Sequence, residues 1–593
     1  MSVIEQIKVS AAKAIHELYG TEIEASAILV NATKPEFEGD YTVVLFAFVK
    51  QLKKSPDVLG TELGECLLKN NSDLFSAYNV IKGFLNLSIS NTVWLNFVTK
   101  NYNNTSYGIA THTGKKVMVE YSSPNTNKPL HLGHLRNNFL GWSIAEILKV
   151  NGNDVVKTCI VNDRGIHICK SMIAWQLFGN GATPENTNTK GDHLVGDYYV
   201  KFNDELKKQI EELIAAGKTK DEAEREAPIM KATQQMLLDW EAGKPEVMEL
   251  WKTMNSWVYA GFDETYKNIG SNFDKVYYES NTYLLGKDLV EKGLAKNVFY
   301  KKDDGSVWID LTADGLDEKI VQRRDGTSVY ITQDIGLAEQ RYEEYKADES
   351  IYVIGDEQNY HMKVLKLICQ KLGLPSADGI YHLSYGMVEL PSGKMKSREG
   401  TVVDADELVA EMIAISKQKT EELGKVKDFT EAELTELYKT IGLGALKFFL
   451  LRVDPKKKMI FNPEESIDFH GFTGPFIQYT HARIKSILRK AEDVASYQLP
   501  VTNDLLKLEK EVIKHIELFP ATLAEAAQEH DPSKVAIYVF NLAQLFNSFY
   551  AQHSIANAES AEKKILRLQI AALSAQVIKT GMQVLGIDVP ERM

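Results

Sequence analysis

Residues 117–147 read VMVEYSSPNTNKPLHLGHLRNNFLGWSIAEI and carry the signals for a strand, a turn and a helix in succession. The apolar run at 117–119 predicts a short strand, and the Ser-Ser-Pro-Asn sequence that follows is typical of a turn. Pro129 stands just ahead of a segment with apolar residues at helical spacing, so we expect a helix to begin near His131. A second apolar run at 154–161 completes a strand–helix–strand succession, which predicts a parallel α/β sheet.

The start of this helix has the composition of an anion-binding site. His131 and His134 are three residues apart and therefore share one face. The N–H groups of a helix start favour anions, and Gly133 lets a flat ligand approach the backbone closely. These features suit an adenine nucleotide whose phosphates lie against the helix start. The alternative is a buried turn whose histidines only satisfy backbone groups, but the flanking Lys128 and Arg136 favour the nucleotide site.

A second basic loop, GKMKSREG, occupies residues 393–400. This loop and the HLGH sequence resemble the KMSKS and HIGH signatures of class I aminoacyl-tRNA synthetases, and SSPNTNKPLHLGHLRN is similar to the arginyl branch of that family. One departure is that the fourth KMSKS position, normally lysine, is Ser397 here, between Lys396 and Arg398. The same departure is found in the arginyl branch, which strengthens the resemblance to that branch. A cation near the pyrophosphate then needs another source, and Lys128 is placed to supply it.

Composition limits the class of protein. The chain of 593 residues is long enough for about three or four domains, and 44% of its residues are hydrophobic. It has no apolar run of membrane-spanning length, no signal-peptide pattern and no Cys-x-x-Cys spacing among its four cysteines. We therefore expect a cytoplasmic protein with no membrane partner and no tightly bound metal or organic cofactor. The net charge of −13 disfavours RNA, although the basic residues at 456–458 and 483–490 could form local basic faces, since charge screening limits the reach of distant acidic groups to about 10 Å.

The chain order predicts a multidomain α/β protein. We expect an α+β domain at 1–107, in which 83–89 alternates like an exposed or edge strand. Residues 108–425 predict the parallel-sheet domain, which the resemblance makes Rossmann-like, with a charged helical insertion at about 185–270. Strands are also expected at 308–311, 328–332 and 351–354; polar residues follow the last two, where ligands of such sheets bind. Residues 430–593 read as an α-helical bundle without a strand signal of any weight.

The resemblance implies a two-step reaction. The carboxylate of arginine attacks the α-phosphate of ATP and expels pyrophosphate, and the adenylate then passes its arginine to the terminal ribose of tRNA(Arg). Positioning and charge stabilisation carry such chemistry, with Mg²⁺ assisting. The implied catalytic residues are Lys128, His131, His134 and Lys394. The implied ATP-binding residues are His131, Gly133, His134, Lys394 and Met395.

The guanidinium of arginine requires a planar, multidentate set of acceptors. The resemblance places Glu120, Tyr330 and Asp334 around the guanidinium, with Tyr330 and Asp334 expected at a strand end. It assigns Ser122, Asn125 and Gln358 to the backbone end or the side chain of the amino acid.

The resemblance also implies contacts with tRNA in both terminal domains. At the tRNA elbow, Phe84 offers a ring to stack on a base and Asn86 an amide to read its edge; the alternative is that Phe84 is core and Asn86 caps a turn. In the helical bundle, the resemblance is to an anticodon-binding domain. Its candidates for base stacking and phosphate contact are Tyr479, Arg483, Tyr550 and Met593.

Three other functions are compatible with parts of this pattern. Small nucleotidylyltransferases also use His-x-Gly-His, but they lack the two terminal domains. A non-catalytic tRNA-binding relative is disfavoured by the intact histidines, Gly133, Lys394 and Lys128. Another class I synthetase is the third alternative. The cysteine branch would need zinc-spaced cysteines, and the glutamate and glutamine branches would lack the Glu120, Tyr330 and Asp334 set. The family is usually monomeric, whereas the tRNA bases read and any need for tRNA in activation do not follow from the residues.

Overall fold

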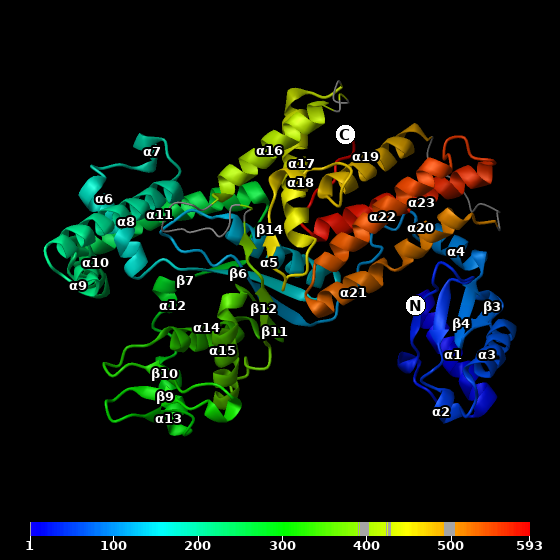
Figure 1. Cartoon of the computed structure of the whole chain (residues 1–593), viewed down its shortest axis with the longest axis horizontal. Coiled ribbons are helices and arrows are strands. Elements are labelled where there is room, and N and C mark those ends of the chain that lie inside the picture. Colours follow the sequence, from blue (N-terminus) through cyan, green and yellow to red (C-terminus); the bar gives the residue numbers. More distant parts are fainter. Residues whose placement is uncertain (1, 390, 392–402, 423, 425–427, 492–503) are drawn as a thin grey trace.

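The computed structural model describes residues 2–389, 391, 403–422, 424, 428–491 and 504–593. Lys394 and Met395, the predicted residues of the second signature loop, lie outside the described residues. Figure 1 shows a parallel sheet near the centre, a helical insertion at one end of the long axis and the N-terminal domain near the other. Among the described helices, none has both the length and the apolar character needed to cross a bilayer.

The central sheet is parallel, as the sequence predicts. Its five strands are β5 (Lys116–Glu120), β6 (Asp154–Val161), β7 (Lys275–Tyr278), β11 (Glu349–Gly355) and β12 (Ile380–Tyr385). They lie in the order β12-β11-β5-β6-β7. The chain thus builds outward from β5 in one direction and later returns to its other side. The reversal between β5 and β11 is the point at which open parallel sheets bind their ligands.

Helix α5 (Leu132–Val150) follows β5, and most of its residues are buried. It has little polar face because it packs on the sheet and also against the C-terminal helices. Across the sheet, α14 (Tyr330–Tyr345) and α15 (Asn359–Leu372) share a second apolar core with Met118 and Tyr352. The sheet therefore has helices on both faces, and α5 begins at the switch point.

The strand expected at 328–332 is wrong, because α14 begins at Tyr330. Valine, isoleucine and threonine favour strands locally, but here Val329 is the N-cap of α14, and Ile331 and Thr332 are buried in its first turn. Only a single bridge between Gln322 and Ser328 remains of strand pairing. Consequently Tyr330 and Asp334 lie one turn apart on a helix rather than at a sheet edge.

Two additions to the sheet lie between β6 and β11, one before β7 and one after it. The first is helical: α6 (Ile166–Phe178), α7 (Pro184–Thr187), α8 (Gly191–Ala215), α9 (Lys220–Glu226), α10 (Pro228–Glu241) and α11 (Pro245–Ile269). The second contains α12 (Glu279–Thr282), α13 (Lys287–Ala295) and an antiparallel sheet of β8 (Tyr300–Lys301), β9 (Val307–Ile309) and β10 (Lys319–Gln322). In Figure 1 these additions extend away from the N-terminal domain.

The N-terminal domain combines helices α1 (Val3–Tyr19), α2 (Val49–Leu52), α3 (Pro56–Asn70) and α4 (Asn91–Asn101) with an antiparallel sheet. The strands β1 (Val30–Ala32), β2 (Tyr41–Val44), β3 (Phe75–Ile81) and β4 (Phe84–Ile89) lie in the order β1-β2-β4-β3. The expectation of an exposed or edge strand at 83–89 is therefore wrong. Strand β4 pairs on both sides, and alternation alone does not distinguish an edge strand from a central one.

The C-terminal part is helical, as expected. It contains α16 (Ala405–Glu422), α17 (Glu431–Leu451), α18 (Pro463–Ser466), α19 (Gly474–Lys490), α20 (Lys507–Glu517), α21 (Phe519–Glu529), α22 (Ser533–Gln552) and α23 (Ala561–Val584). The expectation of no strand here misses the two-residue β14 (Met459–Ile460), which pairs with β13 (Val388–Glu389). Helix α20 also binds the N-terminal domain, since Lys510 and Lys514 form ion pairs with Asp40 at 2.6 and 3.2 Å.

Candidate active site

The two histidines of the HLGH sequence close the start of α5. His131 is the N-cap residue, and its Nδ1 accepts a hydrogen bond from the Gly133 N–H at 3.1 Å. The His131 N–H donates to Nδ1 of His134 at 3.1 Å, and the ring centroids are 3.9 Å apart. The expected shared face is therefore present. Because each Nδ1 accepts from the backbone, each Nε2 carries the proton of the neutral ring and can donate to a ligand.

Both imidazoles are neutral at physiological pH. Burial, reinforced by the charge of Lys128, lowers the pKa of His131 to about 3. Burial also lowers the pKa of His134 well below its usual range, with His131 and Lys128 adding to the effect. The only cation of this group is Lys128, and burial lowers its pKa as well. Neutral donors beside a cation form a suitable surface for phosphate oxygens.

Lys128 and His131 line one wall of a cavity of about 250 Å³. The opposite wall comes from α8 and the start of α16, with His193, Asp197, Asp404 and further residues. Asp404 forms a backbone bridge with His131. The chain that leaves the second signature loop is thus attached directly to the first signature.

An ion-pair network fixes this attachment. Nε2 of His193 lies 3.3 Å from Asp404 and 3.4 Å from Asp406, and Nζ of Lys190 lies 2.6 Å from Asp406 and 3.1 Å from Asp192. Ligand atoms of Asp192, His193 and Asp406 lie within 4.8 Å of one another, a spacing at which they could hold a metal ion. The ammonium of Lys190 already lies between both carboxylates, and His193 adds a second basic group. We therefore interpret the cluster as an ion-pair network.

Asn137 fixes the carboxyl end of β5 and is a residue that the sequence reasoning missed. Its Oδ1 accepts from the Ser122 N–H at 2.6 Å, and its Nδ2 donates to the Val353 carbonyl at 2.7 Å. Ser122 has a positive φ of 58° and is buried. Its hydroxyl bonds the hydroxyl of Tyr266 at 2.9 Å. The adjacent Asn-Asn pair in the sequence was the available signal, but its partners are distant along the chain.

Glu120, a predicted ligand of arginine, already contacts a guanidinium of the chain itself. At the end of β5 its carboxylate forms an ion pair with Arg341 of α14, and both side chains are buried. The carboxylate belongs to the same polar region as Asp334, whose charge acts on it.

Asp334 and Tyr330 lie on one face of α14, because they are four residues apart. The carboxylate of Asp334 accepts from Nε2 of His361 at 2.6 Å and is 40% exposed, so it remains accessible. Tyr330 is 74% exposed. His361, at the start of α15, is a second residue that the sequence reasoning missed, although it ends the GDEQNYH stretch after β11.

The remaining predicted arginine ligands are accessible. Gln358 caps α15 next to the end of β11, and Asn125 forms a bridge with Asn162 at the end of β6; both are exposed. A further carboxylate, Glu279, follows the end of β7. Burial raises the pKa of Glu279 to about 7, while Arg164 opposes the shift. Polar side chains thus follow four of the five parallel strands.

The two N-terminal candidates differ in accessibility. The Phe84 ring is 39% exposed and lies edge-on to the exposed Phe46 ring, with centroids 5.2 Å apart. Asn86 is buried. Its amide is satisfied internally, because Oδ1 accepts from Thr42 at 2.6 Å and Nδ2 donates to Asn79 at 2.9 Å. Phe84 therefore presents a stacking surface, whereas Asn86 holds the sheet together.

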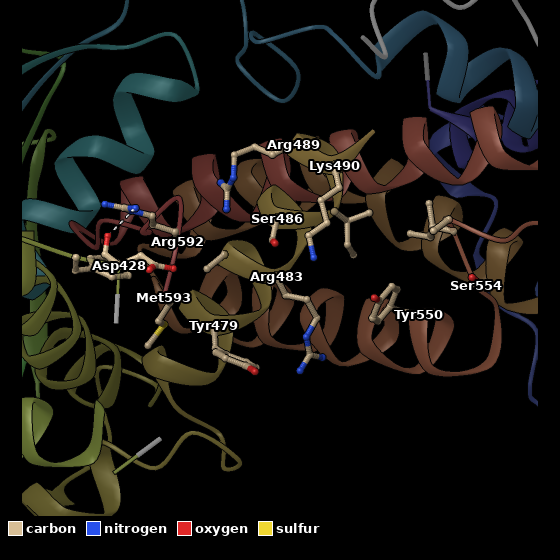
Figure 2. A pocket seen from close by; sticks show the side chains of 15 residues that line it. Asp428, Tyr479, Arg483, Ser486, Arg489, Lys490, Tyr550, Ser554, Arg592 and Met593 are labelled. Carbon is tan, nitrogen blue, oxygen red and sulfur yellow. Dashed lines mark hydrogen bonds between the residues drawn. The ribbon is translucent and has the colours of Figure 1, made fainter. Parts of the chain in front are cut away.

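The four C-terminal candidates meet in one cavity of about 530 Å³ (Figure 2). They come from three different parts of the chain: α19, α22 and the final residue. The guanidinium of Arg483 lies 4.9 Å from the Tyr479 ring centroid and donates to Asn547 at 2.6 Å. The Tyr550 ring is 38% exposed and stacks on Phe546. Basic residues that also line the cavity are Arg489, Lys490 and Arg592.

This combination of aromatic rings and cations suits a single-stranded nucleic acid.

Three family profiles match the chain. They are described as tRNA synthetases class I (R), catalytic domain, at residues 98–462, DALR anticodon binding domain, at 477–593, and Arginyl tRNA synthetase N terminal domain, at 5–89. The chain belongs to the arginyl-tRNA synthetase family. The family predicted from the sequence is thereby confirmed.

Similar proteins cover the chain from end to end. The curated Arginine--tRNA ligase of Bacteroides fragilis is 52% identical over 598 residues, and that of Flavobacterium psychrophilum is 54% identical over 607, each covering 100% of both chains. The solved structure of the Thermus thermophilus arginyl-tRNA synthetase superposes with a TM-score of 0.81 and 25% identity, covering 99% of each chain. The Plasmodium falciparum arginyl-tRNA synthetase shares the fold, with a TM-score of 0.78 and 17% identity over 100% of this chain and 99% of the other.

These matches confirm the predicted fold class and the assignment to class I aminoacyl-tRNA ligases of the arginyl branch. A small nucleotidylyltransferase, a non-catalytic relative and another class I branch are not favoured, because synthetases of the arginyl branch match over the whole length.

Proposed function

We propose that this enzyme activates L-arginine with ATP to arginyl-adenylate and transfers the arginyl group to tRNA(Arg). In the first step a carboxylate oxygen of arginine bonds to the α-phosphorus as the bond to pyrophosphate breaks. In the second, the terminal ribose hydroxyl of tRNA attacks the arginyl carbonyl, and AMP leaves with the electron pair. The observation that carries the proposal is the pair of neutral imidazoles at the start of α5, beside the switch point of the sheet.

At the nucleotide, the roles follow from charge and position. Nε2 of His131 and of His134 donate to phosphate or ribose oxygens, and Gly133 gives the adenine access to the backbone. Lys128 supplies positive charge beside them, and Lys394 of the second loop adds a further positive charge, with Met395 as an uncharged contact to ATP. Because His131, His134 and Lys128 are already grouped at the start of α5, they stabilise developing phosphate charge without reorganisation. Mg²⁺ enters with ATP on its phosphates, as part of the substrate.

At the amino acid, Asp334 is the principal acceptor for the guanidinium, because its carboxylate is accessible. Tyr330 covers the substrate, while Ser122, Asn125 and Gln358 orient the other end of arginine. Glu120 contributes negative charge beneath Asp334 while it holds Arg341. Two carboxylates and a ring favour arginine over lysine through fork geometry more than through charge.

For tRNA, we propose that the anticodon loop enters the cavity between Tyr479, Arg483, Tyr550 and Met593. Phe84 stacks at the tRNA elbow, with Asn86 as its internal support. The corresponding units are an elbow-contacting domain at 1–107, a catalytic domain at 108–425 with its insertion at about 185–270, and an anticodon-binding domain at 430–593. We further propose that the enzyme acts as a monomer in the cytoplasm.

The test is arginine-dependent exchange of pyrophosphate into ATP, measured with and without tRNA(Arg). Exchange that requires arginine supports the proposal, and exchange only with tRNA adds that the pocket is completed by RNA. Lysine in place of arginine serves as the substrate control. Bound tRNA without any exchange would instead support the non-catalytic reading.

A further inference from the structure

A buried lysine outside the proposed chemistry lies where three parts of the chain meet. Lys447 is on α17, is 7% exposed, and donates from Nζ to the Gly586 carbonyl at 2.6 Å. The same ammonium lies 5.4 Å from the ring centroid of Phe139 on α5. Gly270, which ends the helical insertion, faces it at the rim of a cavity of about 140 Å³. A buried ammonium is costly unless it is hydrogen-bonded, and an apolar side chain would fill this space without that cost. The hydrogen bond of Lys447 therefore points to a role beyond packing.

The chain that accepts this bond continues into the candidate anticodon cavity. We call residues 584–593 the C-terminal segment. Its first part lies against α5: the Ser143 hydroxyl donates to the Val584 carbonyl at 2.8 Å, and a Cβ at Gly586 would lie 3.1 Å from the Trp142 ring. Its last two residues, Arg592 and Met593, line the cavity in Figure 2.

Between these ends, side chains of helix α19 bind backbone carbonyls of the C-terminal segment. Gln478 donates to the Asp588 carbonyl at 2.8 Å, a ring nitrogen of His481 lies 3.0 Å from the Pro590 carbonyl, and Arg489 donates to the Glu591 carbonyl at 2.7 Å. Helix α19 also carries Tyr479 and Arg483. Three bonds therefore tie α19 to residues 588–591, and only one residue separates Asp588 from Gly586 along the chain.

We propose that Lys447 is a positioning residue that couples occupation of the anticodon cavity to the placement of α5, and so of His131 and His134. The proposal rests on the function proposed above for that cavity. Lys447 fixes both the C-terminal segment and the apolar side of α5, so it transmits a shift of one to the other. Burial lowers the pKa of Lys447 to about 8, while the nearby Asp588 opposes and Lys439 reinforces the shift.

The test compares Lys447→Met, which keeps the length of the side chain, with Lys439→Met. Lys439 lies on the same helix and lines the same cavity, but it is more exposed. With saturating tRNA(Arg), we expect Lys447→Met to lower the kcat of aminoacylation about tenfold or more. The KM for ATP and the Kd for tRNA should change less than about threefold. Lys439→Met should match the wild type.

The deciding measurement is a double-mutant cycle on kcat with Arg483→Ala. If coupling passes through Lys447, Arg483→Ala lowers kcat in the wild type but adds little in the Lys447→Met background. Additive effects, or an unchanged kcat in Lys447→Met, would overturn the proposal. If Lys447→Met does not fold, Ser143→Ala replaces it in the same cycle. Absence of arginine-dependent exchange in the wild type would instead refute the proposed function.

Discussion

The carboxylate of Glu120 is in direct contact with the guanidinium of Arg341, between the central sheet and α14. The Arg341 guanidinium also lies 4.8 and 5.8 Å from the ring centroids of Tyr277 and Tyr352. A carboxylate at the switch point of the sheet thus already binds the chemical group that the enzyme selects in its substrate. Two variants separate the contribution of Glu120 to stability from its contribution to arginine binding.

Glu120→Gln should destabilise the protein by about 3–5 kcal/mol, because it leaves the buried Arg341 charge without its partner. The double variant Glu120→Gln/Arg341→Met removes both charges and should recover much of this loss. Urea denaturation of the three proteins measures the difference. A Glu120→Gln protein with wild-type stability and a raised KM for arginine would assign this carboxylate to the substrate instead.

Asp334→Asn should raise the KM for arginine and leave the KM for ATP nearly unchanged. A hydrogen bond to a charged group contributes about 1.5–3 kcal/mol, so we expect a rise of roughly 10- to 100-fold. Steady-state pyrophosphate exchange at varied arginine measures it. The matched control is Asp325→Asn, since Asp325 lies in an exposed turn of the small sheet region. An equal effect on both substrates would indicate a general disturbance of α14.

Local sequence patterns correctly predicted the elements for which local propensity and tertiary packing favour the same secondary structure. The N-cap position of His131 and the helix after it follow from residues that are adjacent in the chain. The strand prediction at 328–332 failed because β-branched residues there pack as a helix turn against β10, a tertiary contact that local strand propensity does not encode. The position of β4 inside its sheet failed for a similar reason, since pairing partners are not encoded in its own alternation.

The candidate site divides in the same way. His131, Gly133 and His134 form a continuous motif, so their grouping was predictable. Asn137, His361 and other residues act through partners far along the chain, and a single sequence does not show those pairs. Met593 and Tyr550 were predicted individually through the resemblance, but their convergence with α19 in one cavity is a property of the fold.

His131→Asn should lower pyrophosphate exchange roughly 10²-fold, the usual cost of removing one donor to developing charge. Because the pKa of His131 is lowered to about 3, the wild-type rate should show no inflection from this ring between pH 5 and 8. The pH dependence of stability is opposite to that of a histidine whose pKa is raised by a partner. The ring takes up a proton below about pH 6.5 in the unfolded state but not in the folded state, so the protein becomes less stable as the pH is lowered below 6.5. His131→Asn should make this loss of stability smaller. An inflection near pH 6.5 lost in His131→Asn would contradict the buried neutral ring.

Arg483→Ala should weaken tRNA binding at all anticodon sequences if Arg483 contacts phosphate. The slope of log Kd against log salt should then decrease by about 1. Filter binding across a salt series measures it, with Arg225→Ala on the exposed helix α9 as the control. A loss of discrimination with an unchanged salt slope would instead assign Arg483 to a base edge.

The network around His193 makes stability depend on pH above the pKa of an unfolded histidine, about 6.5. Its hydrogen bond to Asp406 raises the pKa of His193, with support from the charges of Asp404 and Asp192, although burial and Lys190 oppose it. The folded state therefore binds a proton more tightly than the unfolded state. This stabilisation is complete below about pH 6.5, the unfolded value, and is lost as pH rises through the folded pKa.

His193→Gln should therefore lower the Tm at pH 6 and have a progressively smaller effect as pH rises through the folded pKa towards pH 9, because the imidazole then loses its charge. Wild-type Tm should fall between these pH values more steeply than that of the variant. His112→Gln is the control, because His112 forms an exposed ion pair with Asp154 at 2.9 Å. Since Asp404 bridges His131, His193→Gln should also raise the KM for ATP. Parallel Tm curves for wild type and His193→Gln would show that this histidine contributes no charge to the attachment.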